Sequence, residues 1–174
     1  METSQKSLPV TFRPMTPGDI TRVHEIDMLS FSMPWTERSY RFEVTENQHS
    51  VVWVAEVTMP GATDNVNARR VVGMIVIWVI IDEAHIATIA THPDYRGLGI
   101  GRRLMARALL AAYERGARLA YLEVRRGNQV AQNLYNNFGF KIVGERPRYY
   151  QDNHEDALLM TLEELQPDRL GQFA

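Results

Sequence analysis

The sequence predicts a mixed α/β (α+β) fold, with helices on both faces of one sheet, and three observations support this. Apolar residues recur alternately at strand spacing and at helix spacing, as they do where strands and helices pack in layers. The segment Val71–Ile81 is apolar on both of its faces, which is typical of a central strand covered on both sides. The length of 174 residues suits one domain with a core of its own.

Two helices and three strands are expected in the first half of the chain. Thr16, Pro17 and Asp19 form a helix start, with a Thr cap, Pro at the first position and an acidic residue three after the cap. A second short helix is expected after Pro34–Glu37. The strands are expected at residues 51–57, 71–81 and 85–91, with a polar loop at 59–70.

The second half of the chain alternates helices and strands. A helix with Gly116 as its C′ glycine is indicated by one apolar stripe: Ile100, Leu104, Ala108 and Ala112. A second helix, ended by Gly139, is indicated by residues at i, i+3, i+4 and i+7: Ala131, Leu134, Tyr135 and Phe138. Strands are expected at 119–124, 140–143 and 157–162, and the last two should pair as an antiparallel hairpin. The expected order is αα-ββ-β-α-β-α-β-β.

Composition excludes several classes of protein. The chain has 19 Lys and Arg against 21 Asp and Glu, whereas a nucleic-acid binder usually carries a basic excess. It contains no cysteine, which excludes disulfides, thiolate metal sites and a thiol nucleophile, and fits a reducing cytoplasm. The run Val71–Ile81 is too short to span a bilayer, and residues 1–10 lack the apolar core of a signal peptide. We therefore expect a cytoplasmic protein with no nucleic-acid or membrane partner.

Three alternating glycines lie between an expected strand and an expected helix, in the segment Arg96–Gly101 (RGLGIG). Glycines let backbone N–H groups approach a ligand closely, and such groups at a helix N-terminus bind phosphate. Positive charge surrounds the loop, from Arg96, Arg102, Arg103 and Arg107. Arg102 stands where a dinucleotide-binding loop needs glycine, and the chain has no Gly-Lys pair for a P-loop. The alternative is a plain tight turn.

This segment resembles the Q/R-x-x-G-x-G/A signature of the GNAT superfamily of acetyl-CoA-dependent N-acetyltransferases. Further segments resemble the RimI-type protein N-terminal acetyltransferases: Leu122–Arg125, Asn128, Asn133–Tyr135, Phe138–Phe140, Pro34–Glu37 and Arg148–Tyr150. The resemblance implies a mostly antiparallel sheet that splays at its centre. It covers a single domain at residues 10–163, between a flexible N-terminus at 1–9 and a C-terminal tail at 164–174.

The resemblance also implies acetyl-CoA as cosubstrate, with the pyrophosphate on the amides of the glycine loop. The implied binding residues are Ile89, Ala90, Thr91, Arg96, Gly97, Leu98, Gly99, Ile100, Gly101, Arg102 and Asn128. From its position alone, Asn128 is equally a helix cap. The five histidines have no metal-ligand spacing, so no metal is expected, and His85 and His154 are expected to be strand residues.

Glu123 and Tyr135 are the candidate catalytic residues. Strand alternation puts Leu119, Tyr121 and Glu123 on one face, so Glu123 is either a solvated strand-end residue beside Arg125 or a desolvated base. By its helical spacing Tyr135 belongs to the core. The resemblance implies that Glu123 accepts a proton, directly or through water, and that Tyr135 donates one to the departing thiolate.

An α-amine has a pKa of about 7.7–8.0 against about 10.4 for lysine, so one modest base suffices to free it. The resemblance implies a slot for a protein N-terminus between residues 31–37 and 146–154. Its candidate residues are Phe31, Met33, Trp35, Tyr149 and Tyr150, which could equally be partly buried packing residues. The 59–70 loop either shapes access to this slot or is an exposed connection.

The expected function is acetylation of a protein N-terminus of the ribosomal-protein alanine type, by a monomer or weak homodimer. Because the chain has no cysteine, transfer should be direct. The alternatives are a GNAT enzyme that acetylates a small-molecule amine or lysine, and a non-catalytic acyl-CoA-binding module. The module would need neither Glu123 nor Tyr135.

Overall fold

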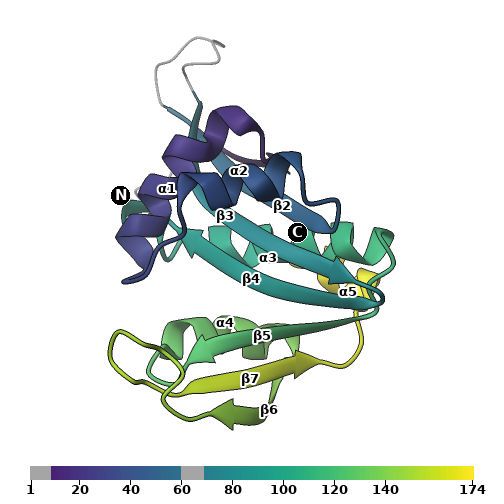
Figure 1. Ribbon diagram of the computed structural model, residues 1–174. Coiled ribbons are helices and arrows are strands. Elements are labelled where there is room, and N and C mark those ends of the chain that lie inside the picture. Colours follow the sequence, from purple (N-terminus) through teal and green to yellow (C-terminus); the bar gives the residue numbers. More distant parts are fainter. Residues whose placement is uncertain (1–8, 60–68) are drawn as a thin grey trace, which may run out of the picture.

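A computed structural model describes residues 9–59 and 69–174 of the chain. The predicted flexible N-terminus, except Pro9, and residues 60–68 of the predicted 59–70 loop lie outside the described residues. The strands form one seven-stranded sheet in the order β1-β2-β3-β4-β5-β7-β6 (Figure 1). Every neighbouring pair is antiparallel except β4 and β5. The predicted mixed, mostly antiparallel sheet is confirmed.

The observed strands match the predicted ones closely, with one addition. They are β1 Val10–Pro14, β2 Ser50–Thr58, β3 Arg69–Ile80, β4 Glu83–Thr91, β5 Leu119–Arg125, β6 Lys141–Arg146 and β7 Ala157–Leu162. Strand β1 was not predicted. It is a five-residue edge strand with Val10 and Phe12 as its only half-buried apolar residues, and it forms because β2 offers it a partner. Such a short alternation carries little signal by itself.

Four of the five helices observed in the described residues were predicted, and two of them follow the capping residues that the sequence indicated. They are α1 Ile20–Ser30, α2 Glu37–Thr45, α3 Ile100–Glu114, α4 Gln129–Phe138 and α5 Pro167–Gly171, with short 3₁₀ turns η1 Pro17–Asp19 and η3 Pro93–Tyr95. The Asp19 carboxylate accepts the Thr16 N–H at 2.7 Å, and Thr36 Oγ1 accepts the Ser39 N–H at 3.1 Å. These bonds satisfy N–H groups that have no partner within the helix.

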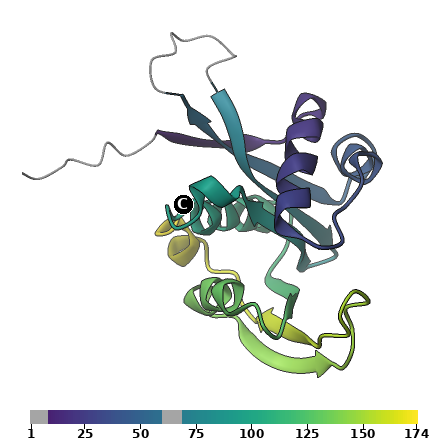
Figure 2. The same cartoon turned by 90° about the vertical axis from the view of Figure 1, so that its left-hand side faces the viewer.

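Helices cover the sheet on both faces, but the cover differs between the two halves of the sheet. Helices α1 and α2 lie against one face, where Met74 and Val76 of β3 pack with Ile20, Val23 and Tyr40. Helices α3, α4 and α5 lie on the opposite face (Figure 2). There α3 and α4 bury the alternate residues of β5 and β7: Ala120, Leu122, Val124, Leu158 and Met160.

The C-terminal end corrects a prediction. The sequence suggests an irregular tail from residue 164, yet Pro167–Gly171 forms α5 and Leu170 is buried. Beyond the helix, the Phe173 ring packs against the Phe138 ring at 4.9 Å between centroids. Leu165, Leu170, Phe173 and Ala174 all reach the core, but the helix itself has only five residues, too few to show a helical period in the sequence.

Replacing Phe138 with alanine is expected to lower the free energy of unfolding by about 3–5 kcal/mol, because its ring is 1% exposed and leaves a cavity when removed. Val130 lies on the same helix and is 83% exposed, so Val130→Ala is the matched control and should change stability by less than about 0.5 kcal/mol. Urea unfolding measures both. Equal losses in the two variants would contradict this packing.

The central feature of the sheet is that β4 and β5 part along their length. They pair in parallel only from Glu83 and Leu119 to Ile86 and Leu122. An extra residue, Ala87, shifts the register between β3 and β4 just after the last of these pairs. Beyond that point β4 and β5 diverge (Figure 1). The facing backbone edges at 88–91 and 123–125 are therefore left without a strand partner in the described part of the chain.

Candidate active site

The glycine loop follows β4 through η3 and leads directly into α3. Gly97 and Gly99 have φ angles of 77° and 73°, in the left-handed region that side chains disfavour. Gly99 is the N-cap residue of α3. The amides of the loop therefore lie at the positive end of the helix dipole. Ile100 is 1% exposed and anchors the helix start, whereas Leu98 is 59% exposed. The local geometry is that of an anion-binding loop.

The four arginines near this loop divide into two pairs. Arg96 donates to the Thr91 carbonyl at 3.0 Å and to Ser30 Oγ at 3.2 Å, which ties the loop to β4 and α1. Arg102 lies beside the loop and over the Phe173 ring, at 5.9 Å. Arg103 and Arg107 instead pack over the Phe12 ring of β1, at 4.9 and 5.2 Å. Of the four arginines predicted to surround the loop, Arg96 and Arg102 lie beside it, and the other two lie against β1.

The end of β4 contributes backbone rather than side chains to the site. Ile89 packs toward α3 and Ala90 toward α1, so both side chains are used by the two cores. Thr91 lies close to Gly101, where a Cβ atom would approach Thr91 Oγ1 to 3.4 Å. The edge of β4 that faces β5 is unpaired here. Its N–H and C=O groups therefore remain free to bind a ligand in extended form.

Glu123 is the first residue of β5 beyond the last pair with β4. As predicted, it shares its half-exposed face with Tyr121, while Leu122 and Val124 are buried. Arg146 Nη1 lies 3.1 Å from its carboxylate, and a hydrogen bond to Glu123 raises the pKa of Tyr149. The sequence suggested Arg125 as the partner of Glu123, but Arg146 holds that place. The carboxylate is thus oriented from β6 and from the loop that follows it.

Arg125 occupies the centre of a polar network between two loops. Its guanidinium donates to Ser32 Oγ at 3.3 Å, in the α1–α2 loop. It also donates to Asp152 and Glu155 in the β6–β7 loop, at 2.9 and 3.3 Å, and stacks on the Tyr150 ring at 3.8 Å. Ser32 and Asp152 hydrogen-bond directly. The two loops of the predicted acceptor slot are therefore joined across the end of β5.

Tyr135 lies on the opposite face of the sheet from Glu123, in the α3–α4 core. Its side chain is 6% exposed and packs against Phe140, with the ring centroids 6.0 Å apart. Burial raises its pKa, so the phenol stays protonated. Burial also raises the pKa of Tyr150 to about 12; the Arg125 charge opposes this rise, and the Glu123 charge adds to it. Tyr150 thus lies within electrostatic reach of both candidate catalytic groups.

Asn128 is the cap of α4, as its position suggests. Its side-chain oxygen accepts the Ala131 N–H at 3.1 Å, and the rest of the side chain is exposed. The cap begins α4 just after β5, so it sets the entry of the helix that carries Tyr135. The cap and a ligand contact are compatible roles for one exposed amide.

The five aromatic and apolar residues predicted to line one slot separate into two groups. Phe31, Met33 and Tyr149 are 37%, 57% and 42% exposed on the two joined loops, and Tyr150 lies beside Tyr149 under the Arg125 guanidinium. Trp35 instead stacks on Tyr40 and Trp78, with centroid distances of 5.5 and 6.1 Å. Its backbone N–H donates to Asp27, a wholly buried carboxylate, at 2.5 Å. Trp35 therefore fixes the α1–α2 loop from the side of the core.

The histidines correct one further prediction. His85 is a strand residue in β4 as expected, but His154 lies in the β6–β7 loop, exposed and with a φ of 57°. Among residues 9–59 and 69–174, no group of three or more His, Asp or Glu side chains could hold a metal ion. No helix within those ranges is long and apolar enough to cross a membrane.

Sequence reasoning missed two residues that position candidate site residues: Arg146, which pairs with Glu123, and Asp27, which holds Trp35. Arg146 comes from a different strand than Glu123, and an extra residue, Val143, shifts the β6–β7 register just before it. Asp27 carries a signal in hindsight, since it lies four residues after Val23 and seven after Ile20, on the apolar stripe of α1. Neither contact is visible from local spacing.

A sheet that opens beside a glycine loop, with a carboxylate at the opening, defines an acyltransferase of the GNAT fold. The model of the acetyltransferase (GNAT) family matches residues 20–140, and the chain belongs to this family. It is an N-acetyltransferase.

The chain is 39% identical over 148 residues to the "putative [ribosomal protein bS18]-alanine N-acetyltransferase" of Bacillus subtilis, covering 85% of this chain and 91% of that protein. It is 30% identical to the [ribosomal protein bS18]-alanine N-acetyltransferase of Escherichia coli, covering 83% and 90%. The E. coli crystal structure has a TM-score of 0.75 and covers 91% of this chain and 96% of its own. Arabidopsis thaliana NAA60, solved with acetyl-CoA, shares the fold, at 19% identity, a TM-score of 0.76 and coverage of 88% and 98%.

Proposed function

We propose that this enzyme transfers the acetyl group of acetyl-CoA directly to the α-amine of a protein N-terminus, of the ribosomal-protein alanine type. The observation that carries the proposal is the place of Glu123, at the point where β4 and β5 part and beside the two joined loops. The names of the B. subtilis and E. coli relatives support the same acceptor. A cytoplasmic location and a monomeric or weakly dimeric state stay predictions.

The donor and the acceptor would approach from opposite faces of the sheet. The glycine loop with Arg96 and Arg102 suits the pyrophosphate of acetyl-CoA, because it combines free amides, a helix N-terminus and two cations. The unpaired edge of β4 suits the amide-bearing arm of the cosubstrate. That arm would run on the side of α3 and α4, where Tyr135 lies. Glu123 faces the other side, with the loops proposed to hold the acceptor.

Direct transfer assigns one proton to each candidate. The amine nitrogen forms a bond to the acetyl carbon, and the carbon–sulfur bond breaks. Glu123 accepts the proton that the amine loses, directly or through water. The Tyr135 hydroxyl donates a proton to the departing thiolate. Burial raises the pKa of this hydroxyl and so keeps its proton in place until then. With no cysteine in the chain, no acetyl-cysteine intermediate is needed or available.

The test is a panel of amines with acetyl-CoA. An Ala-starting hexapeptide without lysine should gain one acetyl group by mass spectrometry, with stoichiometric CoA release, and fragmentation should place the group on the α-amine. The same peptide with a blocked N-terminus is the control. Turnover of polyamines, aminoglycosides or lysine in place of the free N-terminus would overturn the acceptor assignment. Binding of acetyl-CoA with no transfer to any amine would favour a regulatory module.

Gly99→Val is expected to raise the KM for acetyl-CoA at least tenfold. A β-branched residue at the φ of Gly99, 73°, costs about 1–3 kcal/mol and turns the loop amides away from their present direction. Gly18, whose φ is not in the left-handed region and where an added Cβ has room, gives the matched control Gly18→Ala. Steady-state kinetics and acetyl-CoA calorimetry measure the effect. An unchanged KM would remove the loop from the donor site.

Arg125→Gln is expected to raise the KM for the acceptor peptide about tenfold while leaving the KM for acetyl-CoA unchanged. The substitution releases the α1–α2 loop from the β6–β7 loop, because Arg125 contacts Ser32, Asp152 and Tyr150 together. The neighbouring Arg126 is more exposed and pairs with Glu145 and Asp156, so Arg126→Gln is the control. A parallel rise of both KM values would indicate a general loss of structure instead.

A further inference from the structure

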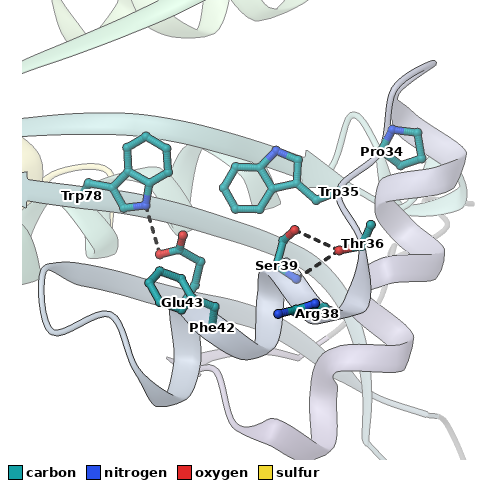
Figure 3. A pocket seen from close by; sticks show the side chains of 8 residues that line it. All are labelled: Pro34, Trp35, Thr36, Arg38, Ser39, Phe42, Glu43 and Trp78. Atoms are coloured by element: carbon teal, nitrogen blue, oxygen red, sulfur yellow. Dashed lines mark hydrogen bonds between the residues drawn. The ribbon is translucent and has the colours of Figure 1, made fainter.

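A hollow of about 560 Å³ lies beside α2 (Figure 3), and neither Glu123 nor any residue of the glycine loop lines it. The stacked rings of Trp35 and Trp78 form its floor, and Phe42, which is 47% exposed, forms part of its wall. The buried carboxylate of Glu43 already accepts bonds from Trp78 Nε1 at 3.0 Å and from Asn47 at 2.8 Å. Since this acid is satisfied, the hollow offers mainly apolar surface, with Arg38, Thr36 and Ser39 as its other polar lining residues.

Strand register connects this hollow to the candidate base. Trp78 of β3 is the partner of His85 in β4, and His85 is the partner of Tyr121 in β5. Partners in neighbouring strands point to the same face of a sheet, and Tyr121 shares its face with Glu123. The rings of His85 and Tyr121 are 5.4 Å apart. One row of half-buried aromatic side chains therefore runs from the hollow to the strand that carries Glu123.

The sheet face on the far side of Glu123 is closed. There the Ser32–Asp152 bond and the Arg125 network join the α1–α2 loop to the β6–β7 loop. Toward Tyr121 and His85, by contrast, none of the helices in the described residues packs on β5 from this face, since α3 and α4 cover its other side. An acceptor chain whose amine lies at Glu123 can therefore extend over the side chains of Tyr121, His85 and Trp78.

We propose that the hollow is a subsite for an apolar side chain of the acceptor protein, downstream of the residue that is acetylated. This inference rests on the proposed function. Neighbouring strands lie about 4.8 Å apart and residues about 3.3 Å apart along a strand, so Trp78 is roughly 12 Å from Glu123 along the sheet. An extended chain covers that distance in about four residues. The side chain that enters the hollow is therefore that of the fourth or fifth residue.

The experiment compares acceptor length and side chain. Ala-starting peptides of three and six residues are assayed, and the hexapeptide carries either leucine or aspartate at positions four and five. The leucine hexapeptide should exceed the other two in kcat/KM by at least about tenfold, since a single methylene in a hydrophobic pocket is already worth about that much. Phe42→Asp should remove this advantage, while the tripeptide rate in the same variant reports on the catalytic centre. Arg41, an exposed neighbour on α2 that does not line the hollow, gives the control Arg41→Ala.

Three outcomes overturn the subsite. The first is an equal kcat/KM for the tripeptide and the leucine hexapeptide. The second is a loss of kcat/KM in Phe42→Asp that is the same for both peptides. The third is that Arg41→Ala removes the advantage of the leucine hexapeptide as fully as Phe42→Asp does. Each of these leaves N-terminal acetylation in place, because the tripeptide is still turned over. Failure of every peptide to accept acetyl overturns the proposed function, and the subsite falls with it.

Discussion

Glu123→Gln is expected to lower kcat by about 10²- to 10⁴-fold, the usual contribution of a positioned general base. Glutamine keeps the shape of the side chain at the point where β4 and β5 part, but it cannot accept a proton. The loss should be largest at low pH. An α-amine with a pKa of about 7.7–8.0 is mostly protonated there, and only the wild-type enzyme holds a base for it. As the pH rises above 8, free amine accumulates and the two rates should converge.

The measurement is a pH profile of kcat/KM with the Ala-starting peptide, together with acetyl-CoA calorimetry. Binding of acetyl-CoA should be unchanged, since Glu123 faces the acceptor side of the sheet. Arg146→Gln is the companion variant, because it removes the 3.1 Å ion pair but keeps the carboxylate. It should reduce the rate less than Glu123→Gln does. A profile for Glu123→Gln that runs parallel to the wild-type profile would remove Glu123 from the proton transfer.

Tyr135→Phe is expected to lower kcat by about 10- to 10³-fold, with the affinity for acetyl-CoA within about twofold of the wild type. The substitution deletes only the hydroxyl, and the ring can keep its packing against Phe140. Because burial raises the pKa of Tyr135 above its ordinary value of about 10, the hydroxyl remains a donor at that pH. The wild-type rate should therefore show no fall near pH 10 from loss of this proton.

A donor with a better leaving group separates a chemical role from a structural one. An acetyl thioester of a more acidic thiol needs less protonation as it departs, so it should narrow the gap between Tyr135→Phe and the wild type. Thermal unfolding of the variant should remain near that of the wild type, since the ring is retained. An equal rate deficit with both thioesters, or a weakened acetyl-CoA affinity, would instead assign Tyr135 to packing alone.

Local signals in the sequence predicted most of the elements, and the structure shows why. Thr16 and Asp19 cap η1, Thr36 caps α2 and Asn128 caps α4, because each bond joins residues three apart. The alternation of β5 likewise placed Glu123 and Tyr121 on the partly exposed face. Such patterns depend on backbone geometry within one element, so one chain segment suffices to read them.

Contacts between segments distant in the chain could not be predicted from such local patterns. The sequence left Trp35 either in a slot with Tyr149 and Tyr150 or as a packing residue, and the structure shows it stacked on Trp78 of β3. It offered Arg125 as the partner of Glu123, whereas Arg125 joins two loops and Arg146 takes that place. Strand β1 and helix α5 also escaped prediction, since each depends on surface provided by another element.

By itself, then, the sequence determined the order of the elements between α1 and β7, the glycine loop before α3 and the face on which the candidate base lies. Only the tertiary structure decided which charges and rings meet at that base and which lie in the hollow beside α2. The physical reason is register. A single extra residue, at Ala87 in β4 and at Val143 in β6, changes which side chains oppose one another across neighbouring strands, and the periodicity of one strand carries no record of that shift.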